Sequence, residues 1–325
     1  MQEHSDTHAP GCGATGGELL HRLRAKGIVD PTCTEVRPLP GGTAGRTWVV
    51  LAGGEPRYVI KCGDARAITA ETLFLEAARN LPLLPRVVHA EPSGGYYVYR
   101  YLPGRRLRRM PGKARIMARL VDDFISRYPP AARCCGWGPV TGPRWPHWPD
   151  FLAARVDEAA AVAGDVLSPE DAALARALAV LPMPGGGHDE APKLLHGDLG
   201  IHNLLFTADE NRLVTVGNEG SSPAADRRPA ATTPELSGVI DPEPLVGPPL
   251  YDLLFAFFSS PDDLEPDILW AAADRLLGPG CVPRDRLLAH ALPVLFCRVA
   301  TCLIHHPDDL PGYVAAWQRF RSELH

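Results

Sequence analysis

The chain has 325 residues, of which 45% are hydrophobic and 22% are charged, and its formal net charge is -5. This length and composition fit a globular protein with two lobes or two small domains, and the negative balance gives no sign of a nucleic-acid-binding surface. The N-terminus has neither a basic start nor an apolar run, and the longest apolar runs, such as 250–258, are too short or too interrupted to span a bilayer. We therefore expect a cytoplasmic protein with no membrane partner.

The eight cysteines show no paired spacing with histidines that would indicate a zinc site. We expect them to be free thiols, most of them buried.

The N-terminal residues 1–17 carry no large apolar side chain after the initiator Met, and we expect them to form a disordered tail. Apolar residues at helical spacing predict a short helix from Glu18, for which Gly27 suits a C-terminal cap. Strands are predicted at 34–40 and 47–51.

The turn between these two strands is rich in glycine and contains Gly41, Gly42 and Thr43. Its backbone N–H groups can approach a phosphate group closely, because glycine has no Cβ. An ordinary hairpin turn is the alternative.

The next predicted strand, 58–60, ends on Lys61, and a helical segment that contains Glu71 and Glu76 follows it. A lysine at the end of a buried strand can be held beside nucleotide phosphates by a glutamate from a helix. A solvated lysine and an ordinary surface glutamate are the alternative.

The run 96–102 is strongly β-prone and ends at Pro103 and Gly104. Seven basic residues then lie between Arg105 and Arg119. Such a run is typical of a solvated face, and a site for an anionic substrate group or partner is the alternative.

Helices are predicted through most of the remaining chain. One begins near Trp145, with Asp150 as a candidate cap, and another begins at Ser168 with a sequence like a capping box. Further helices are predicted at 271–277, 287–302 and 313–324. The stretch 217–237 shows no periodicity, and we expect it to be a mobile surface insertion.

The segment 194–206, L-L-H-G-D-L-G-I-H-N-L-L-F, places His196, Asp198 and Asn203 in a polar loop between apolar clusters. A carboxylate can accept a proton from a hydroxyl, and a carboxamide oxygen five residues later can ligate a cation such as Mg²⁺. The alternative is a corner between two strands, in which the polar side chains only close turns. A later apolar stretch, 238–240, ends on another carboxylate, Asp241.

The order H-x-D-x-x-x-x-N resembles the catalytic loop of protein kinases, and its H-G-D form resembles the aminoglycoside phosphotransferase family within the protein-kinase-like fold. The I-D-P segment at Asp241 resembles the family's metal-binding segment, although Pro242 and Glu243 replace the Phe and Gly of the kinase D-F-G motif. The resemblance covers the chain from about Glu18 to Asp252.

The resemblance implies an α+β, bilobal, protein-kinase-like fold. The N-lobe, 18–102, would be a small antiparallel β lobe that binds nucleotide, and the C-lobe, 103–325, would be mostly helical and would carry the catalytic and acceptor-binding groups. His196 and Asp252 would brace the catalytic loop.

The resemblance also implies a role for each candidate site residue. Asp198 would be catalytic, and Asn203 and Asp241 would hold Mg²⁺. Lys61 would bind ATP, paired with Glu76, because L-E-A-A-R resembles the family's pattern; Glu71 is the competing partner. The nucleotide would also be bound by Gly41, Gly42, Thr43, the carbonyl of Arg100 and the N–H of Leu102.

The implied function is ATP-dependent transfer of a phosphoryl group to a hydroxyl of a small molecule, with an antibiotic as the favoured acceptor. Acidic residues in the C-terminal portion could attract a polycationic aminoglycoside: Glu243, Asp262, Asp263, Asp308 and Asp309. The alternatives are a metabolite kinase of the same fold and a nucleotide-binding pseudokinase. A protein kinase is disfavoured because the chain has no A-P-E segment.

Overall fold

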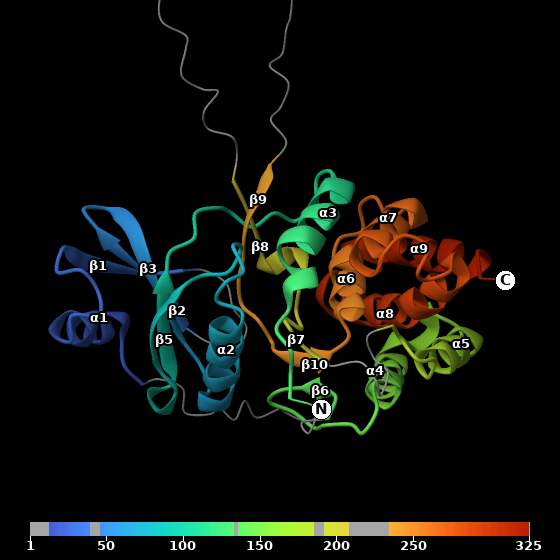
Figure 1. Cartoon of the computed structure of the whole chain (residues 1–325), viewed down its shortest axis with the longest axis horizontal. Helices are drawn as coiled ribbons and strands as arrows, with labels where there is room; N and C mark the ends of the chain where they lie inside the picture. Colours follow the sequence, from blue (N-terminus) through green and yellow to red (C-terminus); the bar gives the residue numbers. More distant parts are fainter. Residues whose placement is uncertain (1–12, 40–45, 133–135, 185–191, 208–233, 325) are drawn as a thin grey trace, which may run out of the picture.

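The computed structural model describes residues 13–39, 46–132, 136–184, 192–207 and 234–324. Figure 1 shows a sheet with two helices at one end of the long axis and a group of helices at the other, with a strand pair between them. The predicted α+β architecture, an antiparallel N-terminal sheet followed by a mostly helical part, is confirmed.

The N-lobe is built on a five-stranded antiparallel sheet with the order β1-β2-β3-β5-β4. Its strands are β1 (Cys33–Pro38), β2 (Arg46–Ala52), β3 (Glu55–Cys62), β4 (Val87–Glu91) and β5 (Tyr96–Arg100). The edge strand β4 has no counterpart among the predicted strands.

Helices α1 (Gly16–Ala25) and α2 (Ala65–Ala77) pack on opposite faces of this sheet. Because successive side chains of a strand point to opposite faces, Ile60 packs on the α1 side, whereas Val59 and Lys61 lie on the α2 side, toward the C-lobe. The strand therefore delivers the lysine to the space between the lobes.

The N-terminal helix begins earlier than the sequence predicted. Thr15 caps α1 through a capping box with Glu18, so the last residues of the expected disordered tail are ordered. Gly27 follows the helix with a φ of 66°, as expected of a glycine at this position.

The C-lobe consists of helices arranged around the long central helix α8. Its helices are α3 (Lys113–Asp123), α4 (Trp148–Ala163), α5 (Pro169–Ala179), α6 (Pro249–Phe258), α7 (Pro266–Leu277), α8 (Arg284–His305) and α9 (Leu310–Ser322). Ser168 caps α5 through the predicted capping box. Asp150 is not the cap of α4: it lies in the first turn, because the helix already begins at Trp148.

Two small sheets flank the segment 196–203 (Figure 1). One contains β6 (Gly138–Pro139), β10 (Leu245–Gly247) and β7 (Lys193–Leu195), and the other pairs β8 (Leu204–Thr207) with β9 (Glu235–Val239). The expected insertion 217–237 is therefore too long at its C-terminal end, because residues 235–237 belong to β9. Its residues 217–233 lie outside the described part of the chain.

By length and composition α8 could cross a membrane, but 72% of its most apolar window is buried inside the protein. It packs against α4, α5, α6 and α9. Its apolar composition is therefore explained by its place at the centre of the C-lobe.

Candidate active site

The loop 196–203, which carries the H-G-D segment, leaves β7 at His196, whose side chain is fully buried. Its Nε2 donates a hydrogen bond to the carbonyl of Ile240 at 3.0 Å, and its Nδ1 accepts one from the N–H of Asp198 at 3.3 Å. Burial lowers the pKa of His196 to about 4, so the ring is neutral at physiological pH. His196 thus ties the loop to the strand end that carries Asp241.

Gly197 has no room for a side chain. Its φ is 81°, and a Cβ at this position would lie 1.9 Å from the carbonyl oxygen of Glu243. The Gly197 N–H donates to Oδ2 of Asp252 at 3.2 Å, and the Tyr128 hydroxyl donates to the same oxygen at 2.7 Å. Burial raises the pKa of Asp252 to about 6, and this aspartate braces the loop from α6.

Asp198 lies between the lobes with 23% of its side chain exposed. Its Oδ2 accepts hydrogen bonds from His202 Nε2 at 2.9 Å and from Asn203 Nδ2 at 2.8 Å. Burial opposes ionisation, but the hydrogen bonds and the nearby imidazoles of His202 and His196 hold the pKa of Asp198 below its usual value. The carboxylate is therefore charged and can accept a proton through its other oxygen.

His202 is a contact of Asp198 that the sequence analysis missed. The signal was present, since the two residues lie four apart in a short loop whose tight turn brings their side chains together. The spacing of four residues therefore predicts a hydrogen bond between His202 and the carboxylate of Asp198.

The side chain of Asn203 is buried, and Nδ2 is the donor in each of its described side-chain hydrogen bonds. The acceptors are Oδ2 and the backbone carbonyl of Asp198, at 2.8 and 3.0 Å, and the backbone carbonyl of Asp241 at 3.4 Å. This arrangement leaves the carboxamide oxygen as a ligand for a cation.

Lys61 links the two lobes through ion pairs. Its Nζ lies 2.7 Å from Oε2 of Glu71 on α2 and 3.1 Å from Oδ1 of Asp241, which follows β9. Oε2 of Glu71 also accepts a hydrogen bond from the Tyr97 hydroxyl at 2.8 Å. Burial opposes the charge of Lys61, but the two carboxylates outweigh it and raise the pKa of the ammonium group.

The predicted pairing of Lys61 with Glu76 is wrong, and Glu71 is the partner. The side chain of Glu71 is 11% exposed, whereas that of Glu76 is 67% exposed and forms an ion pair with Arg79 at 2.8 Å. Five residues on an α-helix correspond to about 500° of rotation, so the two glutamates cannot share a face. Ile68 and Phe74 are buried at the spacing of Glu71, which places this glutamate on the inner face.

Asp241 has a φ of 56°, a backbone conformation that is uncommon for residues other than glycine. Its Oδ1 contacts Lys61, and its Oδ2 accepts a hydrogen bond from NH2 of Arg106 at 2.9 Å. Arg106 was not among the predicted site residues. It belongs to the basic run, for which the sequence favoured a solvated face.

Among the other members of the basic run, Lys113 also departs from that interpretation, whereas the side chain of Arg109 is exposed. Lys113 is fully buried and donates to the carbonyls of Phe257 at 3.0 Å and Ser260 at 2.8 Å, and burial lowers its pKa to about 7. Arg109 forms ion pairs with Asp262 at 3.0 Å and with Asp309 at 3.2 Å.

The predicted adenine contacts lie at the connection between the lobes. Strand β5 ends at Arg100, whose N–H donates to the carbonyl of Arg86 at 2.9 Å, and the side chain of Leu102 lies against Gly238 of β9. Among the described contacts of Asp198, none involves Arg100 or Leu102. Gly41, Gly42 and Thr43 lie outside the described residues, so their expected role stays a prediction.

The residues present fit a hard divalent cation. Asp241 offers carboxylate oxygens, which already attract two cationic side chains, and Asn203 offers a carboxamide oxygen; oxygen donors of this kind suit Mg²⁺. Within the described residues no three His, Cys, Asp or Glu side chains form a metal cluster.

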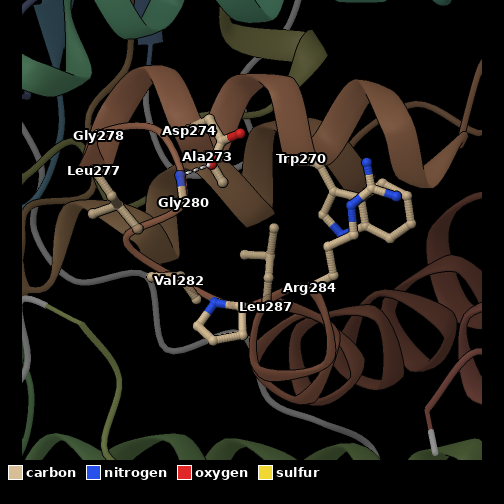
Figure 2. A pocket seen from close by; sticks show the side chains of 10 residues that line it. Trp270, Ala273, Asp274, Leu277, Gly278, Gly280, Val282, Arg284 and Leu287 are labelled. Atoms are coloured by element: carbon tan, nitrogen blue, oxygen red, sulfur yellow. Dashed lines mark hydrogen bonds between the residues drawn. The ribbon is translucent and has the colours of Figure 1, made fainter.

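A cavity of about 190 Å³ lies elsewhere, between α7 and the start of α8 (Figure 2). The guanidinium of Arg284 stacks over the ring of Trp270 at 4.0 Å, and the N–H of Gly280 donates to Asp274 at 3.1 Å. None of the predicted site residues lines this cavity.

Comparison with known proteins gives a match to one family model. The model, described as the phosphotransferase enzyme family (APH), matches residues 35–216, which is more than half of the chain. No curated protein matches the sequence.

Solved structures with low sequence identity share the fold. A thermostable mutant of aminoglycoside phosphotransferase APH(4)-Ia, in ternary complex with ADP and hygromycin B, is 20% identical with a TM-score of 0.60, over 96% of this chain and 100% of that one. The GDP and kanamycin complex of APH(2")-IIia is 15% identical with a TM-score of 0.53, over 92% and 99%. A candidate fructosamine-3-kinase from Thermobifida fusca YX-ER1 is 20% identical with a TM-score of 0.51, over 88% and 94%.

Proposed function

This chain belongs to the phosphotransferase enzyme family, and from that premise we propose that it transfers the γ-phosphoryl group of ATP to a hydroxyl group of a small molecule. The observation that carries the proposal is the convergence of four residues from separate segments. Lys61 contacts Asp241, the backbone of Asp241 contacts Asn203, and Asn203 contacts Asp198, each within 3.4 Å. A charged lysine, two oxygen ligands and a carboxylate base are the groups that phosphoryl transfer requires.

The chemistry follows from the positions of these groups. Oδ1 of Asp198 accepts the proton of the acceptor hydroxyl, whose oxygen forms a bond to the γ-phosphorus. The bond from the γ-phosphorus to the bridging oxygen breaks, and ADP leaves with the bonding electrons. Lys61 neutralises charge on the phosphate oxygens, and Glu71 holds its ammonium group in place.

Asn203 and Asp241 would hold Mg²⁺, which supplies further neutralisation of phosphate charge when bound. Asn203 also positions Asp198 through its hydrogen bond to Oδ2. One side chain thus couples the cation site to the base, and this coupling supports the assignment of both roles.

For the acceptor, we propose an antibiotic, with resistance or self-protection as the biological role. Two of the solved aminoglycoside phosphotransferase structures that share the fold contain hygromycin B and kanamycin, respectively. A metabolite kinase is the second candidate, and the fold shared with a candidate fructosamine-3-kinase supports it. The use of ATP favours the cytoplasm, and nothing in the charge balance favours a nucleic-acid or membrane partner.

Asp198→Asn tests the proposal. We expect the change to lower the rate of phosphoryl transfer by at least about 100-fold, because general base catalysis is worth about 10² to 10⁴ in rate. ADP binding should change little, since the described contacts of Asp198 do not include Lys61. ATP consumption would be measured with purified protein against aminoglycosides, macrolides, nucleosides and sugars.

Asp157→Asn is the matched control, because this aspartate pairs with Arg176 on the surface of the C-lobe. Its activity should equal that of the wild type. Unchanged turnover in Asp198→Asn would refute the catalytic role. Nucleotide binding by the wild type without transfer to any acceptor or to water would support a pseudokinase.

A further inference from the structure

Arg106 places a second cation on the carboxylate expected to bind metal. Its NH2 lies 2.9 Å from Oδ2 of Asp241, while Lys61 lies 3.1 Å from Oδ1 of the same side chain. The side chain of Arg106 is 40% exposed, so one part of the guanidinium holds the carboxylate and the rest remains accessible. The contact spans 135 residues of sequence and brings the connection between the lobes to the catalytic centre.

The backbone at Arg106 is fixed by its neighbours. Arg105 pairs with Phe206 of β8 through two backbone hydrogen bonds of 2.9 Å. Gly104 has a φ of 142°, and a Cβ there would lie 2.6 Å from Oγ of Ser237 on β9. The segment therefore packs tightly against the β8–β9 pair, and any movement of Arg106 is restricted to its side chain.

A divalent cation bound to the oxygens of Asp241 would be repelled by the two cationic side chains that already contact them, which favours the release of one of these side chains. Lys61 has Glu71 as a second partner at 2.7 Å, whereas Asp241 is the acidic partner of Arg106 among the described residues. A released guanidinium would be drawn to the nearest strong anion. A planar fork of N–H donors fits phosphate oxygens in a bidentate manner.

We propose that Arg106 is a phosphate-binding residue of this site, which exchanges the carboxylate of Asp241 for the terminal phosphoryl group of bound ATP. The proposal rests on the function proposed above. It adds Arg106 as a third positive group, beside Lys61 and the divalent cation, that neutralises phosphate charge. Arg106 then neutralises charge that develops on the transferred group.

The test measures equilibrium binding of ATP and ADP to the full chain, with EDTA and with MgCl₂, by titration calorimetry. Arg106→Ala should weaken ATP binding by about 10-fold or more and ADP binding by less than about 3-fold, because a charge-assisted contact to the γ-phosphoryl group is lost. The same variant should need several-fold less Mg²⁺ for half-maximal ADP binding, because the guanidinium no longer competes for Asp241.

Arg108→Ala is the matched control, since it removes the same charge two residues away on an exposed side chain. It should leave the preference for ATP over ADP and the Mg²⁺ requirement within about 2-fold of the wild type. Arg106→Lys should recover part of the ATP affinity through its charge but not the bidentate contact. Thermal unfolding of each variant verifies that it is folded.

Two outcomes would overturn this inference and leave the proposed function intact. One is that Arg106→Ala behaves like Arg108→Ala in both measurements, and the other is that it weakens ATP and ADP equally with an unchanged Mg²⁺ requirement. If the wild type binds neither nucleotide at millimolar concentration, the proposed function fails and the inference fails with it. The wild-type titration thus separates the two failures.

Discussion

At the scale of single residues, the glutamate beside Lys61 shows how helix phase decides a site. The sequence pattern around Glu76 resembled the family pattern, but the inner face of α2 carries Glu71. Tyr97 adds a hydrogen bond to the same glutamate oxygen that contacts Lys61. The helical periodicity of the segment favours Glu71, because Ile68 and Phe74 define the apolar face on which it lies.

This difference gives a paired prediction. Glu71→Gln should lower kcat/KM for ATP by at least about 10-fold, because a buried hydrogen bond between charged groups contributes about 1.5–3 kcal/mol. Glu76→Gln should leave the kinetics unchanged, since its pair with Arg79 is exposed. Steady-state kinetics with varied ATP checks both variants. A loss of activity in Glu76→Gln as large as in Glu71→Gln would contradict the assignment of the partner.

Gly197 gives a prediction about stability. Gly197→Ala would place a Cβ 1.9 Å from the carbonyl oxygen of Glu243, in a residue whose φ is 81°. The backbone strain alone costs about 1–2 kcal/mol, and because backbone atoms on both sides must move, we expect a total loss of more than about 3 kcal/mol. Urea denaturation measures the loss.

Gly164→Ala separates strain from steric clash. Gly164 has a φ of 53°, but nothing lies within 4 Å of its hypothetical Cβ. Its ψ of -131° makes this conformation uncommon for residues other than glycine, so the variant should lose only the strain contribution, about 1–3 kcal/mol. Equal losses in the two variants would show that the contact with Glu243 does not restrict residue 197.

At the scale of elements, α8 carries a buried histidine inside the C-lobe core. His290 is 1% exposed, and its Nε2 has no hydrogen-bond partner among the described residues. Burial, with a smaller contribution from Arg286, lowers the pKa of His290 to about 4. The imidazole of the unfolded chain has a pKa of about 6.5. Between these values the unfolded state binds more protons, so stability falls as pH falls from 6.5 to 4.

His290→Leu should therefore stabilise the protein, and the gain should be larger at pH 5 than at pH 7.5. The pH-dependent part can reach about 3 kcal/mol at pH 4, since one pKa unit corresponds to about 1.4 kcal/mol. Denaturation curves at several pH values measure it. His305→Leu, at the exposed end of the same helix, is the control for loss of a histidine and should change the stability by less than about 0.5 kcal/mol. A gain that is equal at both pH values would contradict the pKa assigned to His290.

At the scale of the whole molecule, local sequence predicted the elements better than it predicted their contacts. The strand that contains Lys61 and the H-G-D segment each carry a local signal. The partners of Arg106 and Arg109 do not, because these contacts join residues 135 and 153 positions apart. The basic run could be recognised from composition, but which of its members would be buried or paired depends on how the lobes pack.

The same packing changes the charge that an acceptor meets. Asp262 and Asp309 were expected to attract a polycation, but Arg109 pairs with both. Both carboxylates therefore already have a cationic partner within the protein.

Arg109→Ala should release both carboxylates and raise the affinity for a polycationic aminoglycoside such as kanamycin by several-fold at low ionic strength. The gain should disappear at about 0.5 M salt, where charges are screened over a few ångströms. Binding would be measured by calorimetry beside a neutral macrolide, whose affinity should not change. Arg108→Ala alters the net charge equally but has no ion pair with either aspartate among the described contacts. An equal gain in both variants would indicate a general charge effect, and no gain in either would place the acceptor away from Asp262 and Asp309.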